Sequence, residues 1–266
     1  MSPIQSSAIP ADIRTEIDRR LEAIRADESV QLLMAVESGS RAWGFPSPDS
    51  DYDVRFIYVQ KRNWYLSLSP GRDVIEQPIV DEIDLNGWDI RKALGLLLKS
   101  NAVISEWMES PVRYCEDHPI VEELRSLADG VLDGRALAFH YANLGRNAAD
   151  RWLEGGEAVP VKKYFYALRP ALAIQHVRLN PKVRPPMNLH ELIAGCDLSQ
   201  SLKADIDELV EAKSRTNERG NGTRKPDLDA FIRDELSRAS EVPGRNKPDA
   251  AMLERANTLF LELVNT

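Results

Sequence analysis

Two short runs, about ten residues apart, carry residue types suited to chemistry on phosphates. Gly39-Ser40 ends an apolar run, and Asp51 and Asp53 lie two positions apart at the start of another. Glycine lets a backbone come close to a ligand, and free N–H groups with a serine hydroxyl can hold phosphate oxygens. Side chains two apart in a strand point to the same face, so the two carboxylates would lie side by side.

Two neighbouring carboxylates repel each other unless a cation lies between them, so the pair predicts a metal site. Oxygen ligands of this kind suit Mg²⁺ or Mn²⁺ rather than zinc. Two such ions would stabilise the attacking and leaving oxygens of an in-line phosphoryl displacement. Each piece alone is weak, because Asp51 and Asp53 could equally be turn residues and Gly39-Ser40 a simple loop. Their order and spacing together favour phosphoryl transfer.

The elements that would position these residues follow from hydrophobic periodicity. The chain has 266 residues, of which 43% are hydrophobic and 29% charged, as in an ordinary globular protein with a substantial core. In the first part we expect helices at 11–26 and 88–99, strands at 31–37, 53–60 and 79–85, a loop at 41–50, and a break at Asn86-Gly87.

After Asp129-Gly130 the pattern becomes almost wholly helical. Helical apolar spacing occurs at 135–153, 161–179, 188–194, 201–213, 227–239 and 248–264. The sequence therefore predicts an α+β protein with two domains. Residues 1–130 would form a catalytic domain with a mixed sheet and flanking helices, and residues 131–266 an all-helical domain that binds nucleotide or substrate.

The charge distribution fits a metal site beside a site for a polyanion. The net charge of −8 argues against a general nucleic-acid coat protein, but residues 135–190 alone carry +6. No apolar run approaches the roughly 20 residues that span a bilayer, and the first ten residues do not resemble a signal peptide. We therefore expect a cytoplasmic protein with no membrane partner, in which Cys115 and Cys196 are buried free thiols.

A more specific pattern extends over much of the chain. Glu37–Phe45 (ESGSRAWGF) followed by Ser50–Arg55 (SDYDVR) resembles the RNA repair pathway DNA polymerase β family, predicted nucleotidyltransferases of bacteria and phages within the DNA polymerase β superfamily. The likeness continues in Asp84–Leu94 (DLNGWDIRKAL) and Lys162–Pro170 (KKYFYALRP). Ser38 stands where the broad superfamily usually has an apolar residue, but a serine fits the narrower family.

The resemblance implies a polymerase-β-like catalytic domain in which three carboxylates hold two Mg²⁺ or Mn²⁺ ions. Asp51 and Asp53 would bind both ions. Asp84, in the third predicted strand, is the expected third carboxylate, and Glu82 on the same face is the second choice. Asp84 would also act as general base on the acceptor hydroxyl; alternatively it caps the helix that follows.

The resemblance also implies that a lysine of the helical domain holds the outer phosphates of a nucleoside triphosphate. Lys162, Tyr166 and Arg169 share one face of the predicted helix at i, i+4 and i+7, and Lys163 lies beside that face. The sequence does not separate the two lysines, and the whole face could instead be a solvated basic surface.

From the other side, the first motif would contact the triphosphate through Gly39, Ser40 and Arg41, although Arg41 could equally be a surface residue. Trp43 and Phe45 either stack on a base or pack in the core.

The function implied is transfer of a nucleoside monophosphate from a nucleoside triphosphate to an acceptor hydroxyl, with release of pyrophosphate. The acceptor is open: an RNA or DNA 3′ end, as the family name suggests, a protein side chain, or a small molecule. Two alternatives remain. One is a protein-modifying, adenylylating nucleotidyltransferase of antitoxin type. The other is a nucleotide-binding module without turnover.

Overall fold

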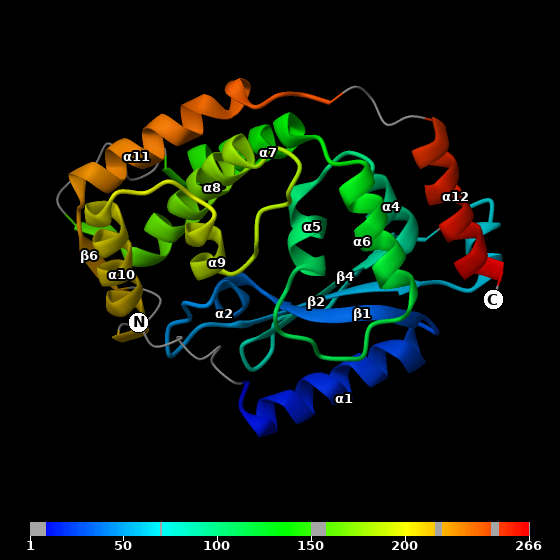
Figure 1. Ribbon diagram of the computed structural model, residues 1–266. Helices are drawn as coiled ribbons and strands as arrows, with labels where there is room; N and C mark the ends of the chain where they lie inside the picture. Colours follow the sequence, from blue (N-terminus) through cyan, green and yellow to red (C-terminus); the bar gives the residue numbers. More distant parts are fainter. Residues whose placement is uncertain (1–8, 70, 150–157, 216–219, 246–249, 266) are drawn as a thin grey trace.

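The computed structural model describes residues 9–69, 71–149, 158–215, 220–245 and 250–265. Its elements run in this order along the chain (Figure 1): α1 (Ala11–Asp27), β1 (Gln31–Ser38), α2 (Gly39–Trp43), β2 (Tyr52–Val59), α3 (Arg62–Tyr65), β3 (Val74–Glu76), β4 (Ile83–Asp89), α4 (Ile90–Leu97), α5 (Ala102–Met108), α6 (Ile120–Gly130), α7 (Gly134–Ala149), β5 (Ala158–Pro160), α8 (Val161–Leu179), α9 (Leu189–Ala194), α10 (Gln200–Arg215), β6 (Asn221–Thr223), α11 (Pro226–Ser237), η1 (Arg238–Glu241) and α12 (Ala250–Asn265).

A mixed sheet of four strands, in the order β1-β2-β4-β3, carries the predicted catalytic residues. β1 runs antiparallel to β2, and β4 runs parallel to β2. The register places Asp53 opposite Ser38 on one side and opposite Asp84 on the other. The end of β1 and the beginnings of β2 and β4 therefore lie side by side, at one end of the strands.

Helices cover both faces of this sheet, because its strands are apolar on both faces. α1 lies against one face, where Ile17, Leu21 and Ile24 join the buried core with alternate residues of β2 such as Val54 and Phe56. α4, α5, α6 and α12 lie on the other face (Figure 1). We refer to α1–α6 with α12 as the sheet lobe.

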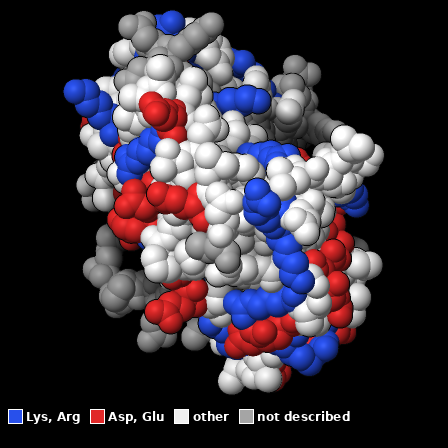
Figure 2. Space-filling model, turned by 90° about the vertical axis from the view of Figure 1, so that its right-hand side faces the viewer, with Lys and Arg blue, Asp and Glu red and all other residues white. Residues whose placement is uncertain are grey.

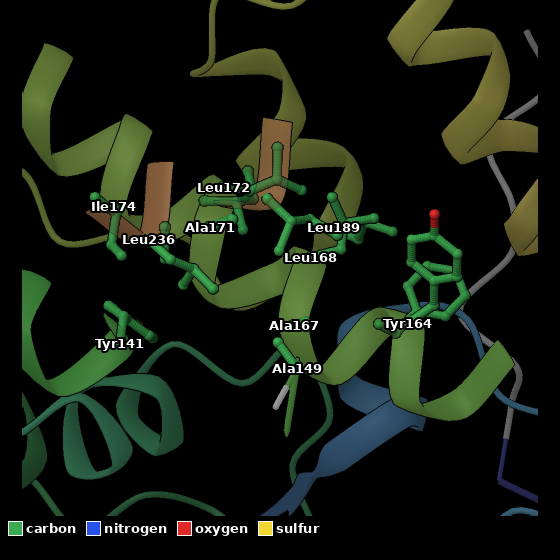
Figure 3. Close-up of a cluster of buried hydrophobic side chains, with 14 of the residues drawn as sticks. Tyr141, Ala149, Tyr164, Ala167, Leu168, Ala171, Leu172, Ile174, Leu189 and Leu236 are labelled. Carbon is green, nitrogen blue, oxygen red and sulfur yellow. The ribbon is translucent and has the colours of Figure 1, made fainter. Parts of the chain in front are cut away.

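The remaining elements, α7 to η1 with the small β5–β6 pair, form a helical lobe around α8. Fourteen residues of α8 are buried, so this helix is the centre of a core rather than a surface element. Figure 3 shows that core, in which Leu168, Ala171 and Leu172 of α8 lie among side chains of the neighbouring helices. α8 thus holds its first turn, with Lys162, at a fixed position beside the sheet lobe.

The predicted elements are largely present, but the third strand differs. It runs over Ile83–Asp89, so Asn86-Gly87 lies inside it and the following helix begins at Ile90 rather than at 88. A Cβ at Gly87 would lie 2.0 Å from the Phe56 ring, so glycine is the residue that this strand needs at the contact. The expected loop at 41–50 likewise begins within the short helix α2.

The C-terminal half is not the all-helical unit that the periodicity predicts. β5 and β6 form an antiparallel pair within it, and α12 returns to pack on α4 and α6 of the sheet lobe. The helices at 161–179, 188–194, 201–213 and 227–239 are confirmed to within a few residues, while residues 150–153 of the first predicted helix lie outside the described residues.

The thiols of Cys115 and Cys196 are free and half-buried. Within the described ranges, no helix has the length and apolar character needed to cross a membrane. The face that bears α12 carries acidic and basic side chains interspersed, without a field of one sign (Figure 2).

Candidate active site

The first motif forms a tight turn on which the Asp53 carboxylate lies. Gly39 has φ +63°, a left-handed conformation that favours glycine. A Cβ there would lie 2.1 Å from Oδ2 of Asp53. The next residue, Ser40, bonds through Oγ to Oγ of Ser50 at 3.0 Å, which joins the turn to the residue before Asp51. The Gly-Ser pair therefore brings the two halves of the motif together.

Asp53 and Asp84 face each other across the parallel strands and share one cation. Nη2 of Arg55 lies 2.9 Å from Oδ1 of Asp53 and 2.7 Å from Oδ2 of Asp84. These side chains are partly buried, with exposed fractions of 31%, 25% and 17% for Asp53, Asp84 and Arg55. Glu82, the second choice for the third carboxylate, is exposed in the turn before β4.

The electrostatics of Asp53 reflect this crowding. Burial raises its pKa, and the carboxylates of Asp84 and Asp51 raise it further. Arg55 and Lys162 act in the opposite direction. Asp53 is thus a carboxylate that gains from positive charge, and Lys162 already supplies some of it from the helical lobe.

A divalent cation fits part of the predicted ligand set. Asp51 and Asp53 both line one hollow between the lobes, and carboxylate oxygens are ligands that Mg²⁺ accepts. Across the described ranges, no three acidic, histidine or cysteine side chains are close enough to hold a metal by themselves. Mg²⁺ is commonly held by one or two carboxylates together with substrate phosphates and waters, so this pair fits it without a third ligand.

The hollow lies where α2 and the start of β2 meet the helical lobe. Its walls are formed by Ser40, Trp43, Phe45, Asp51, Asp53, Lys162, Phe165, Tyr166 and Lys213. It has a volume of about 20 Å³, enough for about one water molecule. A nucleoside triphosphate would therefore need the lobes or side chains to move apart.

Aromatic contacts join the two lobes beside this hollow. Phe45 stacks on Phe165 with ring centroids 4.2 Å apart, and Trp43 meets Tyr166 edge-on at 5.6 Å. Tyr166 remains 45% exposed, so one aromatic surface beside the carboxylates is open to solvent. Trp43 and Phe45 thus pack between the lobes and also line the hollow, so the two alternatives for them are not exclusive.

Comparison with known proteins agrees with the motif. The model of the RNA repair pathway DNA polymerase β family matches residues 13–262. The chain belongs to this family. The match contains both acidic strands, the Gly-Ser turn and the helix α8, so the family is that of the polymerase-β-like nucleotidyltransferases suggested by the sequence.

Two further similarities accompany the family match. The uncharacterized protein YcgL of Bacillus subtilis is 41% identical over 253 residues, which cover 95% of this chain and 96% of that protein. A crystal structure of a nucleotidyltransferase-like protein from Exiguobacterium sibiricum aligns with a TM-score of 0.31 and 11% identity, over 94% of this chain and 80% of that one.

Four of the residues predicted to bind nucleotide do not line the hollow: Gly39, Arg41, Lys163 and Arg169. Arg169 of α8 is buried, pairs with Glu106 at 2.9 Å and lies over the ring of Trp43. Arg41 is buried too, with hydrogen bonds to the carbonyls of Ser50 and Asp51. Both arginines therefore support residues around the hollow and do not line it themselves.

The two lysines that the sequence left equivalent are separated by the structure. Lys162 lines the hollow, whereas Lys163 is exposed and does not. Two other basic residues of the segment 135–190 form ion pairs away from the hollow: Arg178 with Glu235, and Arg184 with Glu109 and Asp129.

Lys213 of α10 is a pocket residue that sequence analysis missed. It is buried, with 3% of its surface exposed, and Nζ donates to Oγ of Ser47 at 2.7 Å. One signal was available: Lys213 continues the apolar stripe of Ile206, Leu209 and Val210 at helical spacing. A lysine on an apolar stripe is unusual unless its charge has a task or a partner.

A larger hollow of about 430 Å³ lies at the other end of the strands, beside Trp64, Arg72 and Arg91. Its acids have structural partners: Asp89 caps α4 and accepts from Tyr65, and Asp73 pairs with Lys92. No residue of the family motif in β1–β2 lines it. The candidate site is therefore the smaller hollow, where the carboxylates and lysines converge.

Proposed function

We propose that the protein is a metal-dependent nucleotidyltransferase that transfers a nucleoside monophosphate from a nucleoside triphosphate to an acceptor hydroxyl. One observation carries the proposal: two acidic residues, Asp51 and Asp53, and two basic residues, Lys162 and Lys213, line the same hollow. Carboxylates suit the metal that accompanies a triphosphate, and lysines suit its phosphates.

The chain's own residues have separate tasks in this reaction. Asp51 and Asp53 would hold the Mg²⁺ or Mn²⁺, one or two ions, with the substrate phosphates. Lys162 and Lys213 would bind the outer phosphates, and the exposed face of Tyr166 would contact the base. When bound, the cation neutralises phosphate charge and polarises the reacting oxygens.

The chemical step forms a bond from the acceptor oxygen to the α-phosphorus. The bond from that phosphorus to the oxygen bridging to the β-phosphate breaks, and pyrophosphate leaves. The hydroxyl proton passes to Asp84. Because Oδ2 of Asp84 is bonded to Arg55, we assign this proton to Oδ1.

The acceptor we favour is an RNA or DNA 3′ end, on the strength of the family's description. The test incubates the protein with each α-³²P-labelled nucleoside triphosphate, Mg²⁺ or Mn²⁺, small RNA and cell protein. Asp53→Asn is the inactive variant. Asp81→Asn is the matched control, because Asp81 precedes the same strand as Asp84 but is exposed and pairs with Arg20.

Label on RNA that is lost only in Asp53→Asn supports the proposal. Label on a protein band keeps nucleotidyl transfer but replaces the acceptor with a protein. Absence of label with all nucleotides, despite measured binding of a nucleoside triphosphate, overturns the proposed transfer reaction. The protein would then be a nucleotide-binding module without turnover.

A further inference from the structure

Glu37 is a fully buried carboxylate that the reaction described above does not use. It is 0% exposed at the end of β1, two residues before Gly39. Acidic side chains are rarely buried to this extent unless they are paired. Oε1 accepts the backbone N–H of Asp53 at 3.0 Å, and Oε2 accepts the hydroxyl of Tyr114. Both oxygens therefore have donors, and one donor is the backbone of a site residue.

Glu37 reaches Asp53 from the opposite face of the sheet. Side chains alternate along a strand, so Glu37 lies on the face of Ala35, which belongs to the core against α1. Asp53 lies on the face of Ile57, which belongs to the core against α4–α6 and α12. Glu37 thus binds the backbone of Asp53 from the α1 face, and the sheet separates its side chain from the hollow.

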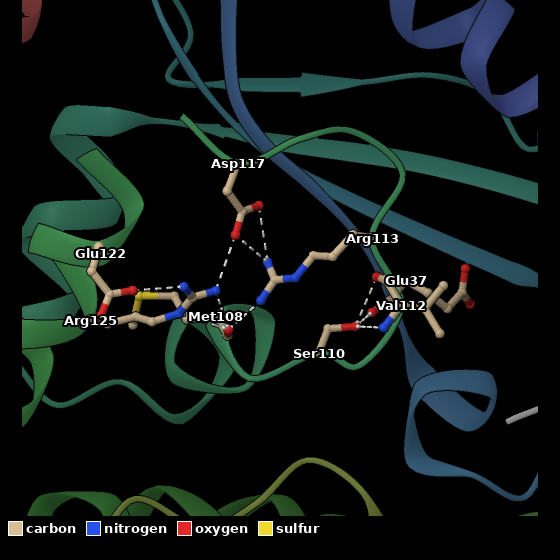
Figure 4. Close-up of polar contacts among 8 residues, drawn as sticks. All are labelled: Glu37, Met108, Ser110, Val112, Arg113, Asp117, Glu122 and Arg125. Carbon is tan, nitrogen blue, oxygen red and sulfur yellow. Dashed lines mark hydrogen bonds and ion pairs between the residues drawn. The ribbon is translucent and has the colours of Figure 1, made fainter. Parts of the chain in front are cut away.

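The partners of Glu37 are fixed by the segment after α5. Ser110 donates through Oγ to the Glu37 carbonyl at 2.6 Å, and the Glu37 N–H donates to the Val112 carbonyl at 3.0 Å (Figure 4). The backbone N–H of Tyr114 donates to the Ala35 carbonyl at 2.8 Å, and Arg14 of α1 lies over the Tyr114 ring.

Ion pairs and hydrogen bonds of two arginines, one of them in α6, hold the segment between α5 and α6 in place. Arg113 and Arg125 both pair with Asp117 and both bond to the Met108 carbonyl (Figure 4). Tyr114 is therefore presented to Glu37 by a segment that is itself anchored.

We propose that Glu37, supported by Tyr114, is a positioning residue that sets the backbone of Asp53 and hence the direction of its carboxylate. The inference rests on the proposed function in one respect, that Asp53 binds the metal. On the face of the hollow, the absence of a side chain at Gly39 leaves room for the Asp53 carboxylate. On the α1 face, Glu37 binds the backbone N–H of Asp53. Metal binding depends on such outer partners because they orient the ligand.

The experiment uses the full chain with Glu37→Ala, Glu37→Gln and Tyr114→Phe. The matched control is Glu235→Ala, an equally buried carboxylate, 2% exposed, that bonds to Gln175 and Arg178 in the helical lobe. Two readouts are needed. Amide hydrogen exchange by NMR reports on the Asp53 N–H, and electron paramagnetic resonance titration with Mn²⁺ alone gives the metal affinity.

We expect Glu37→Ala to speed exchange of the Asp53 amide and to weaken Mn²⁺ binding, each by about tenfold or more. Glu37→Gln keeps an oxygen for the Asp53 N–H and should stay within about twofold of wild type in both readouts. Tyr114→Phe should give a smaller loss than Glu37→Ala, and Glu235→Ala should change neither.

Two results would overturn the positioning role. One is an Asp53 amide that exchanges at the wild-type rate in Glu37→Ala. The other is an equal loss in Glu37→Ala, Glu37→Gln and Glu235→Ala, which would indicate general destabilisation. Failure of the proposed function is recognisable separately: the wild-type protein would then bind no Mn²⁺, while exchange of the Asp53 amide would still respond to Glu37→Ala.

Discussion

Asp53 and Asp84 occupy directly opposed positions on parallel strands, and a single guanidinium joins their carboxylates. Two carboxylates so placed repel each other, and Arg55 compensates that repulsion from the same face of the sheet. The arginine therefore supplies part of the positive charge that a divalent cation would bring to Asp53. Arg55 and the metal are expected to compete for carboxylate oxygens.

Replacing Arg55 with alanine should make the stability of the protein depend on metal. Loss of one partner of a buried charge group costs several kcal/mol, and about 1–2 kcal/mol is expected at this partly exposed site, or roughly 2–6 °C in Tm. Millimolar Mn²⁺ should raise the Tm of Arg55→Ala by more than that of wild type. Differential scanning fluorimetry with and without Mn²⁺ measures both effects.

The control is Arg20→Ala, which removes an arginine that pairs with Glu16 and Asp81 away from the site. Its Tm should respond to Mn²⁺ as wild type does. An identical Mn²⁺ shift in all three proteins would show that Arg55 and the metal do not share ligands.

Gly39→Ala should lower activity on the order of a hundredfold while the protein stays folded. The new Cβ would meet Oδ2 of Asp53 at 2.1 Å, and the φ of +63° is unfavourable for alanine by about 1 kcal/mol. The carboxylate must move, and a displacement of about 1 Å at a reacting centre costs on the order of a hundredfold in rate. Incorporation of α-³²P-labelled nucleotide measures the loss, and circular dichroism confirms the fold.

Gly95→Ala is the matched substitution elsewhere in the sheet lobe. Gly95 lies within α4, and a Cβ there meets nothing within 4 Å. Alanine should stabilise the helix by about 0.5–1 kcal/mol and leave activity unchanged. Full activity in Gly39→Ala would contradict the role given to the turn.

The acidic centre could be predicted because it depends on a local pattern and on a motif that resembles the family. Period-two alternation placed Asp51 and Asp53 on one face, and the resemblance pointed to Asp84, which lies opposite Asp53 in the parallel register. The strand end was missed because Gly87 was interpreted as a break. Its tolerance in β4 depends on the Phe56 ring of a neighbouring strand, a contact that no local pattern encodes.

The helical side of the site was harder to predict, because long-range partners decide where each cation points. Arg169 shares a helix face with Lys162, yet Glu106 of α5 draws it into an ion pair. Lys213, about fifty residues beyond Lys162, is directed to the site by Ser47 of the sheet lobe. Helical periodicity gives the face of a residue but not the charge that it meets.

Lys162→Ala should weaken nucleotide binding, and Lys163→Ala should not. Lys162 lines the hollow with Asp51 and Asp53, whereas its neighbour is exposed outside it. Removal of one charge-assisted bond to phosphate costs about 1.5–3 kcal/mol, or roughly a ten- to hundredfold rise in Kd. Isothermal titration with a non-hydrolysable nucleoside triphosphate compares the variants. Equal losses in the two would assign the effect to general charge rather than to position.

Glu37 should make the stability of the protein fall as pH rises from weakly acidic to neutral. Burial raises the pKa of Glu37 from an ordinary 4.5 to about 7, although the bonds from Tyr114 and Asp53 act against the shift. Between these two values the folded chain holds a proton that the unfolded chain has released. The free energy of unfolding therefore decreases with rising pH across this window, and the decrease is complete above pH 7.

Glu37→Gln removes this titration while keeping the size of the side chain. Its stability relative to wild type should therefore increase between pH 4.5 and pH 8, by roughly 2–3 kcal/mol. Urea unfolding of both proteins at the two pH values measures the change, because groups common to both cancel in the difference. A difference that is the same at both pH values would mean that Glu37 titrates alike in the folded and unfolded chains, and that Tyr114 and Asp53 hold the carboxylate ionised despite its burial.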